Sequence, residues 1–447
     1  MSRSLTQVNC YILLSAVLIV AARGSAQSVD DDSYRNAYDG AIAQQSYDEA
    51  AVIAKMQLAR ALDAGNRDAL STATLYSDLA SAQRLAGNYS AAQLNYETAV
   101  SAIEARTDRM NIALERPLLG LGETLLSDGR PDLALDFFAR AVHVRQVNDG
   151  PHHIAQVDAI EQLGQAYAVL GDTKKSEAMA TRLGVLIERH AATPVIAARE
   201  LWVRQGGLYR LIDMPGMERA AYARAIEAGA AGEPGWVEPY VRTGESFLSE
   251  YLQAYVDASS QDELPDRKLL TDAELALREA IEVAYSDDGL HWQQKYRASL
   301  ALGDFYSVAG NFSEARQAYS EAWKLLTADP AGLSRRAADL ESTTLIWQPP
   351  INVDGLVLLE PGRMLDDGWL PDGRIKVSFS VNRRGRLSNI ALLEISPDRH
   401  PRIEARIKEG LAGYVYRPRM SRGFTVDTAG LTIEFGFSVP SEKATEK

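Results

Sequence analysis

The sequence predicts an α+β protein with two parts: a long array of helical hairpins and, after it, a small domain with the order β-β-α-β. Three observations lead to this prediction. Small and aromatic residues recur with a 42-residue period within residues 34–330, as is typical of stacked structural repeats. From residue 374 apolar and polar residues alternate, as in a half-buried strand. The acidic residues gather in the repeat region, so the two parts also differ in charge.

Composition excludes several classes of protein. The chain has 447 residues, 46% hydrophobic and 24% charged, and is therefore able to bury sizeable cores. Its net charge of −13 argues against a general nucleic-acid binder, so we expect no nucleic-acid partner. The single cysteine, Cys10, excludes a disulfide framework and any multi-cysteine metal site. Residues 27–345 carry a net charge of −17 and residues 346–440 a net charge of +2.

The first 26 residues have the pattern of a secretory signal peptide. Arg3 precedes an apolar run over residues 11–22, and the small residues Gly24 and Ala26 precede a plausible cleavage point. The run has 12 residues, whereas a membrane-spanning helix needs about 20. We therefore expect export to the periplasm with cleavage after residue 26. An uncleaved membrane anchor and a cytoplasmic N-terminal helix are the alternatives.

The repeat pattern is clearest in its last copy. A first helix carries Leu302-Gly303-x2-Tyr306, a turn follows at Gly310-Asn311, and the second helix carries Ala315, Tyr319 and Ala322. Small residues let two helices approach closely, and the aromatic residues fill the space between hairpins. The position of Ala315 has counterparts in the six earlier copies, which are residues 50, 92, 134, 176, 218 and 273.

This pattern resembles the tetratricopeptide repeat, in the long-period form of kinesin-light-chain-like proteins. It indicates about seven hairpins over residues 34–330, with a 13-residue insertion near residues 258–268. Thr271 and Glu274 have the spacing of a capping box that restarts a helix after the insertion. The resemblance implies a concave surface that binds an unidentified peptide. The alternative is a spacer that only holds the next domain.

The C-terminal part has the order β-β-α-β. The first strand begins near residue 374 and ends at the turn Asn382-Arg383-Arg384-Gly385, where glycine suits a hairpin. A second strand covers about residues 387–395, and Ile403, Ile407 and Leu411 mark an amphipathic helix. A last alternating strand contains Leu431, Ile433, Phe435 and Phe437.

This part resembles the TonB C-terminal domain. The resemblance is carried by residues 372–385, by Tyr414-x-Tyr416-x-Pro418, and by the final strand after Gly423. It covers roughly residues 346–440, with poor agreement over residues 354–371. The domains are accordingly a helical repeat array at 34–330, a linker at 331–350, a TonB-like domain at 351–440 and a disordered tail at 441–447.

The resemblance implies binding of outer-membrane receptors through strand addition, which needs an open sheet edge. The candidate edge residues are Leu431, Thr432, Ile433, Glu434, Phe435, Gly436 and Phe437. Arg417, Arg419 and Arg422 form a basic turn beside them, either facing acidic partners or solvated. Two alternatives remain: the repeats cap this strand, or it pairs with a second copy in a homodimer. Energy transduction requires a membrane helix with a polar coupling residue and a proline-rich linker. Neither feature is recognisable in the sequence.

No motif for catalysis is recognisable. The sequence has six histidines but no His-Glu-x-x-His pair, no Walker loop and no nucleophile elbow. We therefore expect a non-enzymatic protein without a cofactor or a metal. The resulting hypothesis is an exported protein–protein interaction protein of the bacterial cell envelope, accessory to TonB-dependent transport. The alternative is a pure periplasmic scaffold or assembly factor whose C-terminal domain only dimerises.

Overall fold

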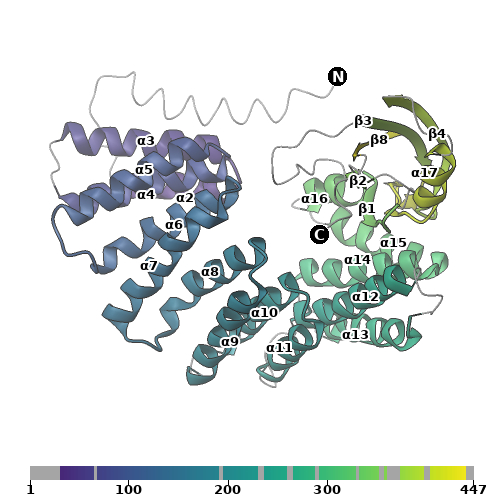
Figure 1. Ribbon diagram of the computed structural model, residues 1–447, viewed down its shortest axis with the longest axis horizontal. Coiled ribbons are helices and arrows are strands. Elements are labelled where there is room, and N and C mark those ends of the chain that lie inside the picture. The colour runs from purple at the N-terminus through teal and green to yellow at the C-terminus, as the bar shows by residue number, and fades with distance from the viewer. Residues whose placement is uncertain are drawn as a thin grey trace, which may run out of the picture. The chain divides into compact units, whose positions relative to one another are not determined.

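The computed structural model describes residues 31–64, 68–190, 195–229, 236–258, 265–286, 291–328, 332–351, 357–359, 373–396 and 403–438. The predicted signal peptide and the predicted tail at 441–447 lie outside these residues. The chain divides into two compact units, residues 1–179 and residues 180–447, and each unit is described by itself (Figure 1). Within the described residues, no helix is both long enough and apolar enough to cross a membrane.

The first unit consists of helices that pack in chain order. These are α2 (Asp31–Ala43), α3 (Tyr47–Asp63), α4 (Ala69–Leu85), α5 (Tyr89–Glu104), α6 (Glu115–Ser127), α7 (Pro131–Asp149) and α8 (Val157–Val169). Short 3₁₀ helices, η1 (Ile112–Leu114) and η2 (Ile154–Gln156), precede α6 and α8. One buried cluster links residues from α4 to α8, so each hairpin buries its apolar face against the next.

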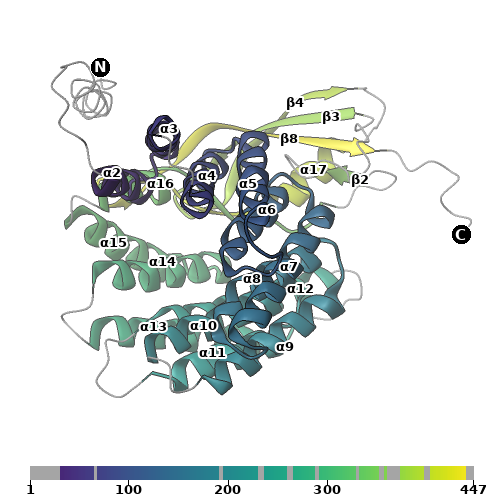
Figure 2. The same ribbon diagram turned by 90° about the vertical axis from the view of Figure 1, so that its left-hand side faces the viewer.

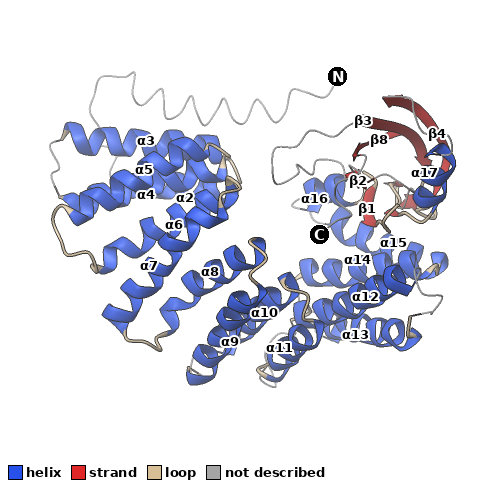
Figure 3. Cartoon of the chain, viewed as in Figure 1, coloured by secondary structure: helices blue, strands red, loops and turns tan. Residues whose placement is uncertain are grey.

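The second unit contains further helical hairpins and ends in a sheet domain. The unit boundary falls within α9 (Thr173–Arg189). The helices that follow are α10 (Val195–Leu211), α11 (Pro215–Glu227), α12 (Glu238–Ala258), α13 (Arg267–Ser286), α14 (Trp292–Ala309), α15 (Phe312–Ala328) and α16 (Gly332–Asp339). Helices α10 to α15 form three successive hairpins, with the strands beyond them (Figure 3).

The described residues contain seven hairpins whose second helices share one frame. The predicted equivalent positions are the fourth residue of α3, α5, α7, α9, α11 and α15 and the seventh residue of α13. All seven side chains are buried, which confirms the register. Five are alanines and two are polar: Ala50, Ala92, Ala134, Ser176, Glu218, Ala273 and Ala315.

A close contact between a glycine and an aromatic ring recurs between the two helices of a hairpin. A Cβ atom added to Gly206 would lie 2.3 Å from the Tyr222 ring, and one added to Gly303 would lie 2.6 Å from the Tyr319 ring. Both rings are almost fully buried, at 1% exposure. The first helix can therefore approach the second this closely only where it has no side chain.

The insertion lies inside the sixth hairpin. Gly244 of α12 packs against Leu277 of α13, and these two helices have 21 and 20 residues, longer than the other helices of the array. Helix α13 begins at Arg267, and the Thr271 hydroxyl donates to the Arg267 carbonyl within that helix. The predicted capping box at Thr271 is therefore wrong, because the helix extends one turn further toward its N-terminus.

The C-terminal domain contains the predicted β-β-α-β order within a larger set of strands. The sheet order is β2-β8-β3-β4, all antiparallel, and β3, β4 and β8 lie side by side in Figure 2. The bounds are β2 (Val357–Leu359), β3 (Gly373–Val381), β4 (Leu387–Ser396), α17 (Ile403–Ala412) and β8 (Thr428–Ser438). Ile375, Val377, Phe435 and Phe437 form a buried core with Ile407 and Leu411 of α17.

Four further strands lie outside the predicted set and form two small two-stranded sheets. Strand β1 (Thr344–Trp347) pairs with β5 (Val415–Arg417), and β6 (Met420–Ser421) forms a small hairpin with β7 (Phe424–Thr425). The predicted linker at 331–350 therefore contains a helix, α16, and a strand, β1. This correction has a physical reason: α16 packs on α15, and Leu340 at its end is fully buried.

Candidate partner-binding site

The seven predicted edge residues all lie in β8, and their side chains alternate between two faces. Phe435 and Phe437 are buried, and Leu431 and Ile433 are half-buried against the same core. Thr432 and Glu434 are exposed on the other face. A partner that added a strand here would therefore meet the backbone edge of β8 with Thr432 and Glu434 as the accessible side chains.

The outer edge of β8 is open over only part of its length. On one side β8 pairs with β3 along nearly its whole length. On the other side Gly436 and Phe437 pair with Leu359 and Leu358 of β2. The prediction of an open edge is therefore wrong for these two residues, because a segment of the same chain occupies their edge. Among the described residues, no strand pairs with the outer side of β8 over residues 428–435.

Arg417 lies in a different environment from the one its sequence position suggested. It is only 9% exposed, and its Nε and Nη2 atoms donate to the two carboxylate oxygens of Asp304 at 2.9 and 2.5 Å. Its Nη1 atom donates to the carbonyl of Asp339 at 3.1 Å. Arg417 is therefore engaged by the repeat array and is not available to a partner.

The three arginines of the predicted basic turn do not form one cluster. The Arg419 side chain is half-buried, and its Nε atom has no hydrogen-bond partner among the described residues. Arg422 is exposed at the tip of the β6–β7 hairpin with φ +52°. Of the three, only Arg422 presents its charge to solvent without a partner among the described residues.

Arg417 is the centre of a junction that joins the sheet domain to the last hairpin. Met420 donates its backbone N–H to the Leu340 carbonyl at 2.6 Å, and its side chain is buried in the cluster of hairpins six and seven. The Arg386 guanidinium donates to the Ser307 carbonyl at 3.3 Å. Because buried contacts of both domains interlock here, α14, α15, α16 and the sheet domain form one body.

The electrostatics of the junction are those of a desolvated ion pair. Burial alone lowers the pKa of Arg417, but the Asp304 carboxylate outweighs burial and raises it, so the guanidinium stays charged. Tyr319 donates its hydroxyl to Asp304 at 2.9 Å. Burial, together with this carboxylate, raises the pKa of Tyr319 well above its ordinary value. The carboxylate therefore accepts from a cation and from a neutral phenol.

A groove of about 560 Å³ lies beside this junction. Its walls come from α12, α13, α14 and the segment after α16, and they are mainly apolar, including Leu248, Leu252, Phe305 and Trp347. Trp347 packs edge-on against Tyr255 with ring centroids 5.8 Å apart. Arg210, Glu245 and Asp304 supply polar groups to the lining. The first helices α10, α12 and α14 thus contribute to a concave surface with apolar walls and a few polar groups.

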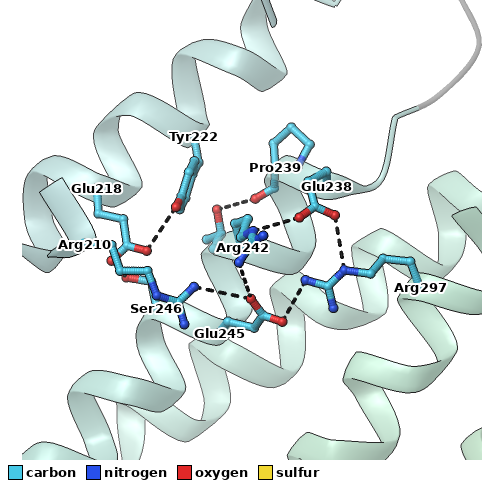
Figure 4. A network of polar contacts seen from close by, with 10 residues as sticks. Arg210, Glu218, Tyr222, Glu238, Pro239, Arg242, Glu245, Ser246 and Arg297 are labelled. Carbon is cyan, nitrogen blue, oxygen red and sulfur yellow. Dashed lines mark hydrogen bonds and ion pairs between the residues drawn. The ribbon is translucent and has the colours of Figure 1, made fainter. Parts of the chain in front are cut away.

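An ion-pair network extends from this groove across the first helices of three hairpins (Figure 4). Glu245 accepts from Arg297 at 2.8 Å and from Arg210 and Arg242 at 3.4 Å each. Glu238 accepts from Arg242 at 2.7 Å and from Arg297 at 3.2 Å. Burial alone raises the pKa of Glu245, but the three guanidiniums outweigh it and lower the pKa. The network keeps α10, α12 and α14 in register.

Glu218 occupies a repeat position that is an alanine in most other hairpins. Its side chain is 3% exposed and accepts from Ser246 at 2.8 Å and from Tyr222 at 3.1 Å (Figure 4). Burial raises the pKa of Glu218, and these hydrogen bonds and the charge of Arg210 only partly offset it. The hydrogen bonds tie α11 to α12.

Most of these groups cannot be recognised from sequence. The Glu238, Arg242 and Glu245 spacing of four and three residues predicts neighbours on one helix face, but it does not predict Arg297 as the partner. Asp304 and Arg417 are separated by 113 positions. Within the described residues, no group of three or more His, Cys, Asp or Glu side chains has the arrangement of a metal site.

Comparison with known proteins gives structural neighbours only. No family model and no curated protein matches the sequence. The solved structures that match include the C-terminal part of a TPR repeat-containing protein from Cytophaga hutchinsonii, with 14% identity, 67% of this chain and 98% of that chain covered, and a TM-score of 0.37. A tetratricopeptide repeat protein from Parabacteroides merdae has 16% identity, 65% and 94% coverage, and a TM-score of 0.37. A thermophilic TPR protein from Thermus thermophilus has 21% identity, 48% and 99% coverage, and a TM-score of 0.33.

Proposed function

We propose that this chain is an exported, non-enzymatic protein–protein interaction scaffold of the bacterial cell envelope. Its C-terminal sheet binds a segment of an outer-membrane TonB-dependent receptor by strand addition, and its helical hairpins hold a second protein partner. In this role it assists TonB-dependent transport without transmitting energy itself. The proposal combines the signal-like N-terminus with the hairpin array and the open part of β8.

The observation that carries the proposal is the junction at Arg417 and Asp304. A flexible linker would let the sheet and the repeats act independently, whereas this buried ion pair holds the sheet against α14. The groove beside Trp347 and the free edge of β8 therefore belong to one body. Two binding elements held by one rigid support are what a scaffold needs in order to bring two partners together.

Strand addition at β8 is supported by its geometry over residues 428–435. The edge lacks a partner strand among the described residues, and its core-facing side chains are already packed. A receptor segment would gain affinity from backbone hydrogen bonds, with Thr432 and Glu434 as the side chains next to it. The pairing of β2 with Gly436 and Phe437 limits the length of such a segment.

The experiment is a titration of purified residues 27–447 with synthetic peptides from the N-terminal segments of receptor plug domains. Each peptide is compared with a form in which alternate backbone amides are N-methylated. Methylation leaves the side chains unchanged but removes the donors that strand addition uses. The proposal predicts binding that is lost on methylation. Equal binding of both forms, or no binding of any receptor peptide, would contradict it.

A matched pair of variants locates the site. Replacing Thr432 by lysine changes an exposed side chain of β8, and replacing Ala391 by lysine does the same on β4. We expect the first variant to weaken peptide binding and the second to leave it unchanged. The reverse result would place the site at the other edge of the sheet.

Export is tested separately. The full-length chain is expressed in a bacterium, and the N-terminus of the periplasmic product is sequenced by mass spectrometry. The proposal predicts a product that begins at Gln27. Retention of all the protein in the cytoplasm would contradict export while leaving the binding experiment intact.

A second candidate function is a scaffold whose sheet domain only dimerises. The observation that favours it is β4, which has no partner on its outer side among the described residues and exposes Leu393 at 56%. Light scattering on residues 27–447 distinguishes the two functions. A dimer that dissociates when Leu393 is replaced by lysine would support the second function, and a monomer would exclude it.

A further inference from the structure

A basic and aromatic surface lies where the last repeat helix meets the sheet domain. It surrounds a cavity of about 400 Å³. Helix α15 contributes Phe312 and Arg316, the β3–β4 turn contributes Arg383 and Arg384, and the β6–β7 hairpin contributes Phe424. This surface is formed by different elements from the groove beside Trp347 and does not include β8, so it is separate from the proposed sites.

The charges at this cavity are poorly neutralised. Its lining contains three arginines and no carboxylate. Arg316 is exposed and makes no hydrogen bond or ion pair with any described residue. Arg384 is exposed as well, and its guanidinium lies 5.5 Å from the Phe312 ring centroid. Arg383 is the exception, because Asp427 accepts from its backbone N–H at 2.7 Å and lies 3.8 Å from its Nε atom.

The apolar part of the surface is equally unusual. Phe424 is 70% exposed, the largest fraction among the large apolar side chains of the described residues. Phe312 has guanidiniums on its ring from two arginines, because Arg386 also lies 5.7 Å from its centroid. Arginine and aromatic side chains are the residue types that dominate binding energy at protein interfaces. An exposed phenylalanine among unneutralised arginines is therefore suited to contact with a partner protein. Leaving such an apolar side chain exposed to water is unfavourable.

The cavity continues into a larger groove of about 960 Å³. Arg316, Ser313 and Phe424 line both, so the two concavities are adjacent. The groove follows α13, α14 and α15 and mixes charges, with Arg278 and Lys324 opposed by Glu314 and Glu321. The positive charge is therefore concentrated at the cavity end, and the groove extends from it as a path for a polypeptide.

We infer that this surface binds an acidic segment of a partner protein that carries an apolar or aromatic residue. Carboxylates of the segment pair with Arg316 and Arg384, and its apolar side chain packs against Phe424. Charge complementarity selects the segment, since the lining offers cations with no competing carboxylate. The surrounding repeat region is strongly acidic, which repels the same segment elsewhere on the array.

The test is fluorescence anisotropy of residues 27–447 with a labelled peptide, Asp-Glu-Trp-Glu-Asp. The neutral peptide Asn-Gln-Trp-Gln-Asn is the comparison. We expect the acidic peptide to bind, and its affinity to fall as the salt concentration rises. In the double variant Arg316→Glu/Arg384→Glu its affinity should fall about tenfold or more. Phe424→Ala should lose affinity for both peptides, because the tryptophan of each peptide packs against Phe424. The neutral peptide has no other contact with the surface.

The matched control is Arg189→Glu on α9, an exposed arginine outside the surface with no bonded partner among the described residues. It makes the same charge reversal and should leave peptide affinity unchanged. Arg316→Gln/Arg384→Gln removes the charges without reversing them, and thermal unfolding checks that each variant folds.

Three outcomes would overturn the inference. One is the absence of acidic-peptide binding at low salt, and another is equal loss of affinity in Arg189→Glu and in the double variant. The third is binding of phosphatidylglycerol vesicles, but not of the peptide, through Arg316 and Arg384, since that would assign the surface to a membrane. Failure of receptor peptides to bind at β8 would leave all three readouts unaffected.

Discussion

The guanidinium of Arg417 and the carboxylate of Asp304 form a two-point ion pair, with N–O distances of 2.9 and 2.5 Å, between strand β5 and helix α14. The side chains are 10% and 22% exposed, so water screens the pair weakly. This contact joins the sheet domain to the last hairpin of the repeat array.

Breaking this ion pair should be costly because it leaves one buried charge alone. Asp304→Asn should lower the free energy of unfolding by about 3–5 kcal/mol. Replacing both partners, with Asp304→Leu and Arg417→Met, should cost much less because no charge remains buried. Urea unfolding followed by circular dichroism measures both.

The control for the ion pair is Glu188→Gln, which breaks the pair between Glu188 and Arg224, whose side chains are 55% and 50% exposed. Exposed pairs contribute about 0–1 kcal/mol. If Asp304→Asn cost no more than this control, the junction would not be a stabilising contact.

Glu218 should make stability depend on pH in a defined direction. Burial raises the pKa of Glu218 in the folded state, so the native protein retains the carboxyl proton of Glu218 to higher pH than the unfolded chain does. The free energy of unfolding therefore falls as pH rises from the ordinary glutamate pKa through the raised one. Glu218→Gln removes the charge, can accept from Tyr222 with its amide oxygen and donate its amide N–H to the Ser246 hydroxyl oxygen, and should be more stable than the parent at pH 7.

The advantage of Glu218→Gln should disappear near pH 4, where the parent glutamate is protonated in both states. Urea midpoints at the two pH values measure the difference, with the exposed Glu227→Gln on the same helix as the control. A variant that is less stable than the parent at pH 7 would show that the charge of Glu218 is a net benefit there.

Two adjacent glycines on α10 should respond oppositely to alanine. At Gly206 the added Cβ would lie 2.3 Å from the Tyr222 ring, whereas at Gly207 nothing lies within 4 Å. Gly206→Ala should therefore destabilise the protein by about 1–3 kcal/mol through overpacking. Gly207→Ala should stabilise it by about 0.5–1 kcal/mol, because alanine is the better helix residue. Thermal unfolding of both variants tests this, and similar effects of the two would refute the packing account.

The turn between the two helices of a hairpin contains a residue in the left-handed conformation, and in the first hairpin this residue is a glutamine. Gly87 and Gly129 have φ +79° and +75°, while Gln45 at the equivalent position has φ +58°. A side chain costs about 1–2 kcal/mol in this conformation, so Gln45→Gly should raise stability by about 1 kcal/mol. The neighbouring Gln44→Gly should not, because Gln44 is not among the residues with positive φ. A loss of stability in Gln45→Gly, measured by urea unfolding, would contradict the turn assignment.

The sequence was most informative where a local rule acts repeatedly. The small residue at the fourth position of a second helix and the alternation from Ile375 to Val381 each depend on neighbours a few positions away. Those patterns predicted the seven hairpins and the β3–β4–α17–β8 order. The hairpins and this order of elements therefore follow from local periodicity.

The features missed from the sequence depend on contacts between distant residues. The segment 331–350 is predicted to be a linker, but Leu340 within it is buried with Met420 in the hydrophobic cluster of the last two hairpins. The availability of β8 depends on β2, a short strand with no distinctive pattern. Arg417 is one arginine among several in its segment, and only its contact with Asp304 separates it from the exposed Arg422.

The measurement that tests the central proposal most directly is amide hydrogen exchange across the sheet, with and without a receptor plug-domain peptide. If the peptide adds as a strand, amides within residues 431–435 of β8 exchange more slowly in its presence, while those of β4 are unchanged. Unchanged exchange in β8 at saturating peptide, or protection confined to β4, would contradict strand addition at this edge.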